Sequence, residues 1–338
     1  MPTPPRKILV IQLRRIGDVL LTTPAVEVLK ANFPDAKLHF LVERPCHEVL
    51  NGNPFIDEVL VYERDKPLKW IREVRKRRYD LVVDFLSNPR SAVVTFLSGA
   101  RLKAGPGYTS SRWAYNVRFP NATAHEYSAF RKIDQLTALG LKTILHPRPR
   151  LFLPSWADKY RSNRFREMGL SAGDAVIGFA PASRRATRIW PADHYAALAR
   201  SITQKTDCKI IVFWGPGEKE LAQRIASALP ERVMASPETK NLAELGALLK
   251  GLKLLVCNFN GTKHIATALD VPTLGIFGMC GPASWTPPDD ERQQAIGKDD
   301  LPCISCHLTE CPRNLECLYQ LAPETVFKKL EQMLSNIR

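Results

Sequence analysis

The sequence predicts an α/β protein of two Rossmann-like domains, residues 1–150 and 151–338, whose parallel sheets face a central cleft. Three observations lead to this prediction. The chain has 338 residues, more than one hydrophobic core usually holds. Short apolar runs alternate with helix-length amphipathic segments through both halves, as in βαβ units. Residues 145–156 are dense in proline and basic side chains, which is typical of an interdomain linker.

In the first half the expected strands are β-branched runs, and the expected helices lie between them. The strands are expected at 7–13, 37–42, 58–62 and 80–86, and the helices at 24–34 and 68–79. Strands that alternate with helices pair in parallel and are covered on both faces. The basic run 75–78 is expected at a helix end, where cations suit the helix dipole.

The second half repeats this order. Its strands are expected at 174–180, 208–214, 231–235, 252–258 and 272–278, and its helices at 194–205, 218–229, 242–251, 264–270 and 323–334. The last helix begins at Pro323, because proline is favoured in the first turn of a helix, and it should close the domain.

Charge is distributed unevenly along the chain. Residues 1–150 hold 25 Lys and Arg against 14 Asp and Glu, whereas residues 151–338 hold 23 against 20. The basic first half is therefore expected to meet an anionic partner. We expect no nucleic acid partner, because aromatic side chains are not interleaved with the basic runs and no reading motif is present. An anionic lipid or glycolipid stays open.

Several classes of protein are excluded or disfavoured by what the sequence lacks. No apolar run approaches the roughly 20 residues of a membrane-spanning helix, and the start MPTPPRK has no signal-peptide core. The chain is therefore expected in the cytoplasm. A dinucleotide fingerprint, a Walker A sequence, a nucleophile elbow and a zinc-protease motif are also absent, which argues against a nicotinamide dehydrogenase.

Small and polar residues follow three strands of the second half, in FAPASRRATRIWP, FWGPGEKE and CNFNGTKHIATAL. In a parallel sheet these turns lie at one edge, where helix N-termini offer free N–H groups to a phosphate. The candidate phosphate ligands are Arg188, Asn260, Gly261, Thr262, Lys263 and His264. Plainer roles stay open, because Lys263 can be solvated and His264 can be a core histidine. Trp190 is expected to be a packing residue.

Asp18 follows the first strand in the turn RRIGD. An Asp at a strand-to-helix turn can cap the helix by accepting hydrogen bonds from backbone amides. A carboxylate at the carboxyl end of a strand also lies where open α/β sheets bind their ligands. This stretch alone leaves both roles open.

Five segments in order carry a resemblance over nearly the whole chain: ILVIQLRRIGDVLLTTPAVEVLK, PASRRATRIWPADHYAALA, WGPGEKELAQRIA, NGTKHIATALDVPTLGIFG and CPRNLECLYQLAPETV. They resemble glycosyltransferase family 9, the lipopolysaccharide heptosyltransferases. The resemblance implies a GT-B fold, with an acceptor-binding domain at 1–150 and a nucleotide-sugar-binding domain at 151–338. It also implies inverting transfer without a mandatory metal or cofactor, usually from ADP-L-glycero-D-manno-heptose. The implied acceptor is a lipid A and inner-core glycolipid, met by peripheral association with the inner leaflet of the membrane.

The resemblance also assigns roles to single residues. Asp18 matches the family's catalytic aspartate, which takes the proton of the acceptor hydroxyl while the diphosphate departs. Arg188 stands where the family has a lysine, and Ser183 where it has a small hydroxyl residue. Gly261 and His264 match the family's Gly and His.

Further candidates are less closely tied to the family pattern. Glu218 lies near an acidic family residue thought to meet the ribose of the nucleotide. On the acceptor side, the basic domain offers Arg14, Arg15, Tyr108 and Arg112.

Phe259 departs from the family, which has an acidic residue at this position. Three interpretations compete: a different donor sugar, a side chain turned into the core, or weakened activity. The alternatives to a heptosyltransferase are therefore a non-catalytic or altered-donor relative that binds a nucleotide sugar or glycolipid, and another GT-B enzyme such as a nucleotide-sugar epimerase.

Four of the eight cysteines form the cluster Cys303, Cys306, Cys311 and Cys317. Four thiols this close can hold a structural metal, but the spacing lacks the paired knuckles of a typical zinc site. Plain thiols are the favoured interpretation, ahead of a metal or a disulfide. The other four, Cys46, Cys208, Cys257 and Cys280, are expected in the core.

Overall fold

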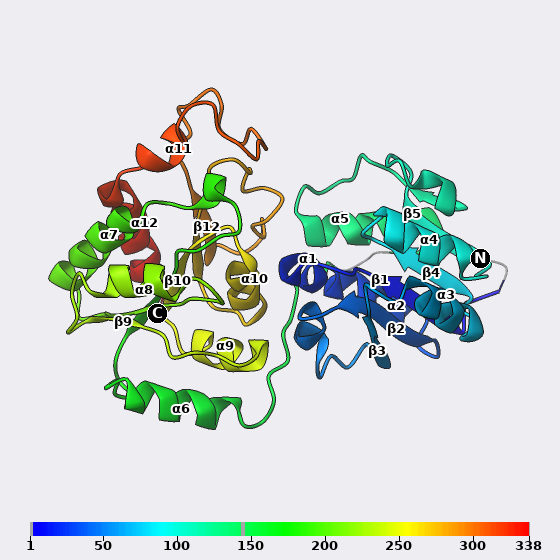
Figure 1. Ribbon diagram of the computed structural model, residues 1–338, viewed down its shortest axis with the longest axis horizontal. Coiled ribbons are helices and arrows are strands. Elements are labelled where there is room, and N and C mark those ends of the chain that lie inside the picture. Colours follow the sequence, from blue (N-terminus) through cyan, green and yellow to red (C-terminus); the bar gives the residue numbers. More distant parts are fainter. Residues whose placement is uncertain (1–2, 143–145, 338) are drawn as a thin grey trace. The chain divides into compact units, whose positions relative to one another are not determined.

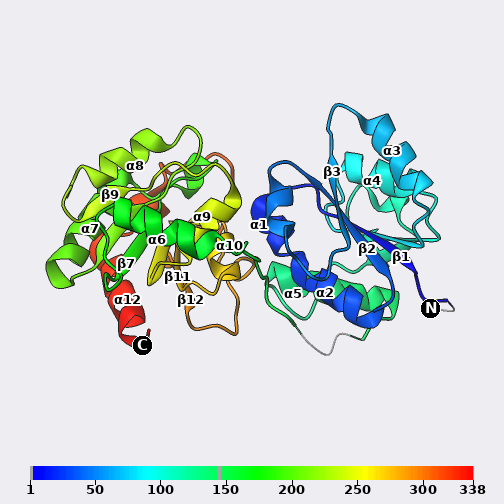
Figure 2. The ribbon, with the colours of Figure 1, turned by 90° about the horizontal axis from the view of Figure 1, so that it is seen from below.

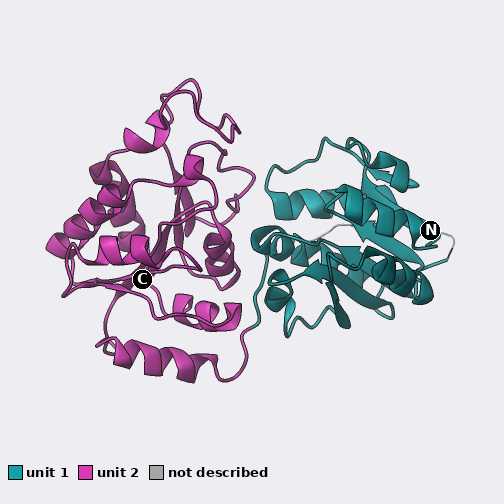
Figure 3. Cartoon of the chain, viewed as in Figure 1, with its two compact units in different colours: residues 1–152 teal, residues 153–338 magenta. Residues whose placement is uncertain are grey.

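The computed structural model describes residues 3–142 and 146–337. The chain divides into two compact units, Met1–Phe152 and Leu153–Arg338, each with a sheet of its own (Figure 3). The sequence placed this division at residue 150. Leu145, the first residue of the expected linker, lies outside the described residues, and the rest of the linker forms neither helix nor strand.

Unit 1 (residues 1–152) is built on a six-stranded parallel sheet in the order β3-β2-β1-β4-β5-β6 (Figure 1). Its strands are β1 (Lys7–Ile11), β2 (Lys37–Glu43), β3 (Glu58–Tyr62), β4 (Leu81–Asp84), β5 (Leu102–Pro106) and β6 (Val117–Phe119). Its helices are α1 (Ile16–Leu20), α2 (Thr23–Asn32), η1 (Cys46–Leu50), α3 (Pro67–Lys76), α4 (Pro89–Leu97), η2 (Arg112–Ala114), α5 (Ser128–Gln135) and η3 (Leu136–Leu139), where η marks a 3-10 helix.

Helices cover both faces of this sheet. α3 packs against α4, and α2 packs against α5. Leu9 and Ile11 of β1 join Trp70 of α3 and Val94 of α4 in one buried cluster. Ile8 and Val10, the residues of β1 that alternate with these two, are also fully buried, as expected for a strand between two layers of helices.

Unit 2 (residues 153–338) carries a second six-stranded parallel sheet, in the order β12-β11-β10-β7-β8-β9. Its strands are β7 (Val176–Ala180), β8 (Lys209–Val212), β9 (Val233–Ala235), β10 (Leu254–Asn258), β11 (Thr273–Ile276) and β12 (Gln293–Ile296). Its helices are α6 (Ala157–Glu167), η4 (Ala186–Arg188), α7 (Ala192–Lys205), α8 (Lys219–Ala226), α9 (Leu242–Leu249), α10 (Gly261–Ala268), α11 (Glu316–Tyr319) and α12 (Pro323–Asn336).

The core of unit 2 lies where α7, α8 and α12 pack on one face of the sheet. α6 packs against α9 and α9 against α10, and Figures 1 and 2 show these three helices apart from α7 and α12. The expected closing helix from Pro323 is confirmed as α12, which packs against α7. Every helix of the described residues falls short of the length and apolarity needed to cross a membrane.

Candidate functional site

Each sheet reverses its direction of winding at one pair of neighbouring strands. In unit 1 the pair is β1 and β4, and in unit 2 it is β7 and β10. Open α/β sheets bind ligands at the carboxyl ends of such a pair, which is called the switch point. The candidate site residues are therefore those that follow these four strands, taken unit by unit.

Asp18 lies in α1, the short helix that follows β1. Its Oδ2 accepts a hydrogen bond from the backbone N–H of Arg15 at 3.2 Å, so the carboxylate does cap the start of the helix. The residue nevertheless stays partly exposed. The negative charge of Asp18 also acts on Lys132. Burial lowers the pKa of Lys132, and Asp18 offsets part of this lowering. Capping therefore orients the Asp18 carboxylate without burying it.

A second carboxylate, that of Asp84, ends β4 beside Ile11, and the sequence analysis missed it. It accepts hydrogen bonds from the N–H groups of Leu86 and Ser87 at 3.0 and 2.9 Å and from the Tyr115 hydroxyl at 2.8 Å. Burial raises the pKa of Asp84, and these hydrogen bonds lower it in part. The side chain is fully buried, so it holds the loop after β4. The sequence feature that could have indicated Asp84 is an Asp at the end of the apolar run LVVD.

The four acceptor-side candidates are exposed residues of unit 1. Arg14 and Arg15 follow β1, whereas Tyr108 and Arg112 follow β5. The Tyr108 hydroxyl accepts a hydrogen bond from Nε2 of Gln135 at 3.3 Å. Because β5 pairs with β4, which pairs with β1, all four candidates lie at the carboxyl edge of the same sheet.

In unit 2, Asn260 begins α10 at the end of β10. Its Oδ1 accepts a hydrogen bond from the backbone N–H of Lys263 at 3.0 Å, and its Nδ2 donates to the carbonyls of Ala180 and Ala182 at 3.2 and 2.8 Å. The side chain thus ties the end of β7 to the start of α10. Gly261 and Thr262, the first residues of this helix, stay partly exposed, and backbone N–H groups in a first turn have no partner within the helix.

Lys263 departs most from the sequence-based prediction. It is fully buried, its Nζ donates to the carbonyl oxygen of Trp285 at 2.9 Å, and Nζ lies 5.3 Å from the centre of the Phe259 ring. Burial lowers the pKa of Lys263 to about 8. The prediction that Lys263 binds a diphosphate is therefore wrong, because its ammonium group points into the core.

Phe259 explains why Lys263 points inward. The Phe259 ring is buried with Phe277 and Met279, so the interpretation of a side chain turned into the core is confirmed. Gly275 of β11 leaves the space for both residues, because a Cβ there would clash with the Phe259 ring and with Cε of Lys263. The aromatic ring and the ammonium group form a buried cation–π pair.

Arg188 lies at the end of η4, on the segment that follows β7. Its Nε is buried and has no hydrogen-bond partner among the described residues. The thiol of Cys280 is near: burial raises the pKa of Cys280, and Arg188 and Arg185 lower it in part. Ser183 is partly exposed on the same segment. A guanidinium with a spare donor is suited to an anion.

The remaining donor-side candidates lie around these two segments. His264 is buried, and its ring centre lies 5.7 Å from that of Trp285. Glu218 accepts a hydrogen bond from the N–H of Gly215 at 2.8 Å and stays partly exposed in the turn after β8. Trp190 is fully buried and donates to a main-chain carbonyl, which confirms its packing role.

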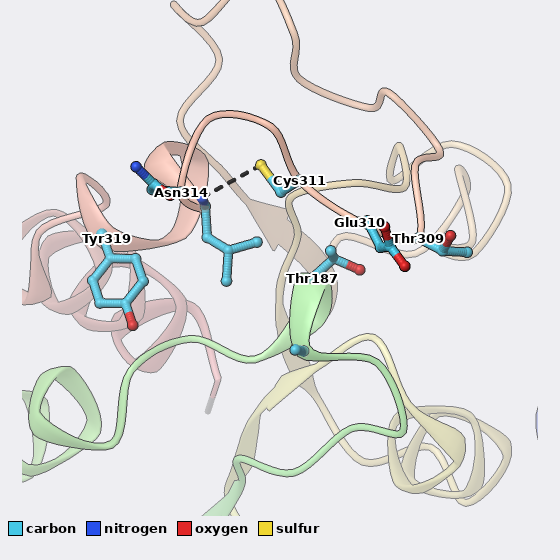
Figure 4. A pocket seen from close by; sticks show the side chains of 8 residues that line it. Thr187, Thr309, Glu310, Cys311, Asn314 and Tyr319 are labelled. Atoms are coloured by element: carbon cyan, nitrogen blue, oxygen red, sulfur yellow. Dashed lines mark hydrogen bonds between the residues drawn. The ribbon is translucent and has the colours of Figure 1, made fainter.

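A surface pocket of about 630 Å³ opens beside η4 in unit 2 (Figure 4). Thr187 contributes to one side, and Cys311, Asn314 and Tyr319 come from the segment before and within α11. The Cys311 thiol accepts a hydrogen bond from the N–H of Leu315 at 3.3 Å. The sequence analysis missed this pocket because its two sides come from distant parts of the chain.

Cys46, Cys208, Cys257 and Cys280 are buried, as predicted. In the cluster of four, burial and the three neighbouring thiols raise the pKa of Cys317. Within residues 3–142 and 146–337, these four thiols are not part of a set of three or more potential ligands that lie within 4.8 Å of one another.

Comparisons with known proteins agree with this arrangement. The model of the family "Glycosyltransferase family 9 (heptosyltransferase)" matches residues 68–316. Lipopolysaccharide heptosyltransferase 1 of Pseudomonas aeruginosa is 25% identical over 357 residues, covering 97% of this chain and 98% of its own.

Solved structures show the same fold. A family 9 glycosyl transferase from Veillonella parvula matches with a TM-score of 0.83 at 23% identity, covering 98% of this chain and 97% of its own. The Escherichia coli heptosyltransferase WaaC with ADP-2-deoxy-2-fluoro heptose matches with a TM-score of 0.70 at 22% identity, covering 96% of this chain and 99% of its own.

The family match spans most of the chain, and both units have the layered parallel sheets of the GT-B relatives. The chain therefore belongs to glycosyltransferase family 9, the heptosyltransferase family of lipopolysaccharide biosynthesis, and is a glycosyltransferase.

Proposed function

We propose that this protein transfers heptose from ADP-L-glycero-D-manno-heptose to an inner-core glycolipid, with inversion at the anomeric carbon. The observation that carries the proposal is that Arg188 and the start of α10 follow β7 and β10, the two strands at the switch point of unit 2. The buried Nε of Arg188 has no hydrogen-bond partner among the described residues. A guanidinium and main-chain N–H groups are the donors that a diphosphate requires. The nucleotide sugar in the Escherichia coli relative is of the same class.

The donor is held by residues of unit 2. Arg188 and the N–H groups of Gly261 and Thr262 bind the diphosphate, and the Ser183 hydroxyl adds a hydrogen bond. Glu218 binds a ribose hydroxyl with the carboxylate oxygen that does not accept from the Gly215 N–H.

Asp18 is the general base of the transfer. It accepts the proton of the acceptor hydroxyl while that oxygen bonds to the anomeric carbon of the donor. The bond from this carbon to the diphosphate oxygen breaks, and ADP leaves with the electron pair. The N–H of Arg15 holds the carboxylate in one orientation. Because the diphosphate is a good leaving group when cations hold it, a second carboxylic acid is not required.

The acceptor and the membrane meet unit 1. Arg14, Arg15 and Arg112 bind the anionic groups of the acceptor, and the Tyr108 ring packs on one of its sugars. An exposed aromatic patch lies nearby in the chain: the rings of Phe96 and Trp113 are 5.3 Å apart.

Cations border this aromatic patch. Nζ of Lys103 lies 5.6 Å from the centre of the Phe96 ring, and Arg101 is exposed two residues earlier. Aromatic rings beside cations favour the interface of an anionic membrane, so we assign the patch to peripheral membrane association.

Two variants separate chemistry from donor binding. Asp18→Asn is expected to lower the rate of heptose transfer by roughly a hundredfold to ten-thousandfold, because a positioned base contributes that much. Its affinity for ADP, measured by calorimetry, should change little. Arg188→Ala is expected to weaken ADP binding by about tenfold or more, since it removes charge-assisted hydrogen bonds.

Transfer is measured by mass spectrometry, as the gain of one heptose on heptose-deficient lipopolysaccharide incubated with ADP-heptose. Arg184→Ala is the matched control, because this arginine is exposed on the same segment. Undiminished transfer by Asp18→Asn would contradict its role as base. Equal ADP affinity in Arg188→Ala and Arg184→Ala would remove Arg188 from the donor site.

A further inference from the structure

Three side chains that the transfer does not use converge in unit 1, outside the switch point. His125 lies in the loop between β6 and α5, Asp134 lies in α5, and His146 lies on the segment that leads out of the unit. Nδ1 of His125 is 3.0 Å from Oδ2 and 3.2 Å from Oδ1 of Asp134, and Nε2 of His146 is 3.3 Å from Oδ1. One potential ligand atom from each residue lies within 4.8 Å of the other two.

The surroundings hold these three side chains in place. The backbone N–H of His125 donates to Oδ2 of Asp134 at 3.0 Å, and the Asp134 side chain is only 13% exposed. The Phe130 ring packs edge-on against both imidazoles, with ring centres 5.4 and 5.0 Å apart. The carboxylate is thus fixed by the main chain, and one aromatic ring lies against both imidazoles.

The three groups match the donor set of an open zinc site. Zinc sites that keep one open position use three protein ligands, with imidazole nitrogen and carboxylate oxygen at about 2.0–2.2 Å from the metal. Two such bonds at a tetrahedral angle place their ligand atoms about 3.3 Å apart. Oδ1 of Asp134 lies at close to this distance from both histidines, 3.2 Å from Nδ1 of His125 and 3.3 Å from Nε2 of His146.

We propose that His125, Asp134 and His146 bind one divalent metal ion of the zinc class, with a fourth position for water. Of the three ligands, His125 also lines a surface pocket of about 320 Å³, together with Thr123 and Arg131. The metal would fasten the segment that contains His146 to α5. The site is structural, since it lies outside the residues assigned to donor and acceptor.

Cobalt binding tests the proposal with a spectroscopic readout. The untagged full chain is stripped with a chelator and titrated with Co²⁺. We expect one equivalent to give the visible d–d bands of a tetrahedral site without a thiolate charge-transfer band. His125→Gln and His146→Gln should each lose these bands. Both side chains are partly exposed, so the variants should fold, and circular dichroism checks this.

Two controls exclude other histidines and the cysteine cluster. His307→Gln changes an exposed histidine beside Cys306 and should keep the bands. A variant with serine at Cys303, Cys306, Cys311 and Cys317 should keep them as well.

Zn²⁺ provides a second readout, because a metal that binds only the folded state raises Tm. Zn²⁺ should raise Tm in the wild type and not in His146→Gln. An absence of d–d bands in the wild type, or bands that survive in both histidine variants, would overturn the proposal. So would bands that are lost with the cysteines, or a Zn²⁺ effect on Tm that is equal in wild type and His146→Gln.

Discussion

Lys263 carries an ammonium group into the interior of unit 2, which links its protonation to folding. Its pKa is about 8 in the folded protein, against an ordinary value of 10.5. Between these two values the unfolded chain binds more protons than the folded chain, so the free energy of unfolding rises with pH in this window. Below it, the buried charge costs about 3 kcal/mol.

Lys263→Met is therefore expected to remove the rise of the free energy of unfolding with pH in this window. Methionine fills a similar volume without a charge, so the variant should be at least as stable as the wild type at neutral pH. Chemical denaturation at a series of pH values across the window measures both effects. Lys250→Met, which changes an exposed lysine, serves as control and should keep the wild-type slope. The same slope in Lys263→Met would show that the Lys263 charge is not the cause.

At the residue scale, local signals placed Asp18, Arg188 and Gly261 at the ends of strands. These signals did not predict that the Lys263 side chain points into the core. In α10 the buried residues run without a break from Lys263 to Ala266, so no polar face marks the outer side of the helix. The direction depends on the space above Gly275, which lies on another strand and is invisible to a local pattern.

At the scale of elements, β4 and β5 are joined through the segment that follows η2. The Tyr115 hydroxyl reaches Asp84 at the end of β4, and Gly105 of β5 lies under the Tyr115 ring. A Cβ at Gly105 would come within 2.6 Å of that ring, so the ring must shift to admit even an alanine.

Gly105→Ala is expected to lower the free energy of unfolding by about 1–3 kcal/mol, the usual cost of overpacking a core. Displacing Tyr115 also takes a hydrogen bond from the buried Asp84. Urea denaturation measures the loss. Gly173→Ala is the control, because no atom lies within 4 Å of a Cβ there and the φ angle is ordinary. Equal stability of the two variants would mean that the Tyr115 ring moves freely.

The elements that the sequence analysis predicted are those with apolar, β-branched strands and amphipathic helices. Among the strands it did not predict β5, β6 or β12, and among the longer helices it did not predict α4, α5 or α6. β5 has the sequence LKAGP and β12 has QQAI, so neither carries the alternation or the β-branched residues of a typical strand. Both form because a neighbouring strand offers its main-chain donors and acceptors, which is a tertiary effect.

At the scale of the whole molecule, the excess of positive charge in the first half coincides with exposed aromatic rings. Phe96 and Trp113 are 49% and 50% exposed, and Lys103 adjoins them. If this patch contacts the membrane, affinity for anionic vesicles depends on both ring burial and charge.

Trp113→Ala is expected to weaken sedimentation with vesicles that contain an anionic phospholipid, because a large ring no longer enters the interface. Added salt should weaken binding of the wild type as well, since it screens the attraction. Trp156→Ala removes an exposed tryptophan of unit 2 and is the matched control. Identical binding by the two variants would place the membrane contact elsewhere.

The division of the chain between Phe152 and Leu153 has one more consequence. Each sheet buries its own apolar side chains within one unit, so neither core depends on the other for its packing. Chimeras that exchange the first 152 residues with those of a relative should preserve both interiors. If unit 1 binds the acceptor and unit 2 the nucleotide sugar, as proposed above, such a chimera would take the acceptor preference of the relative and keep the donor of this protein.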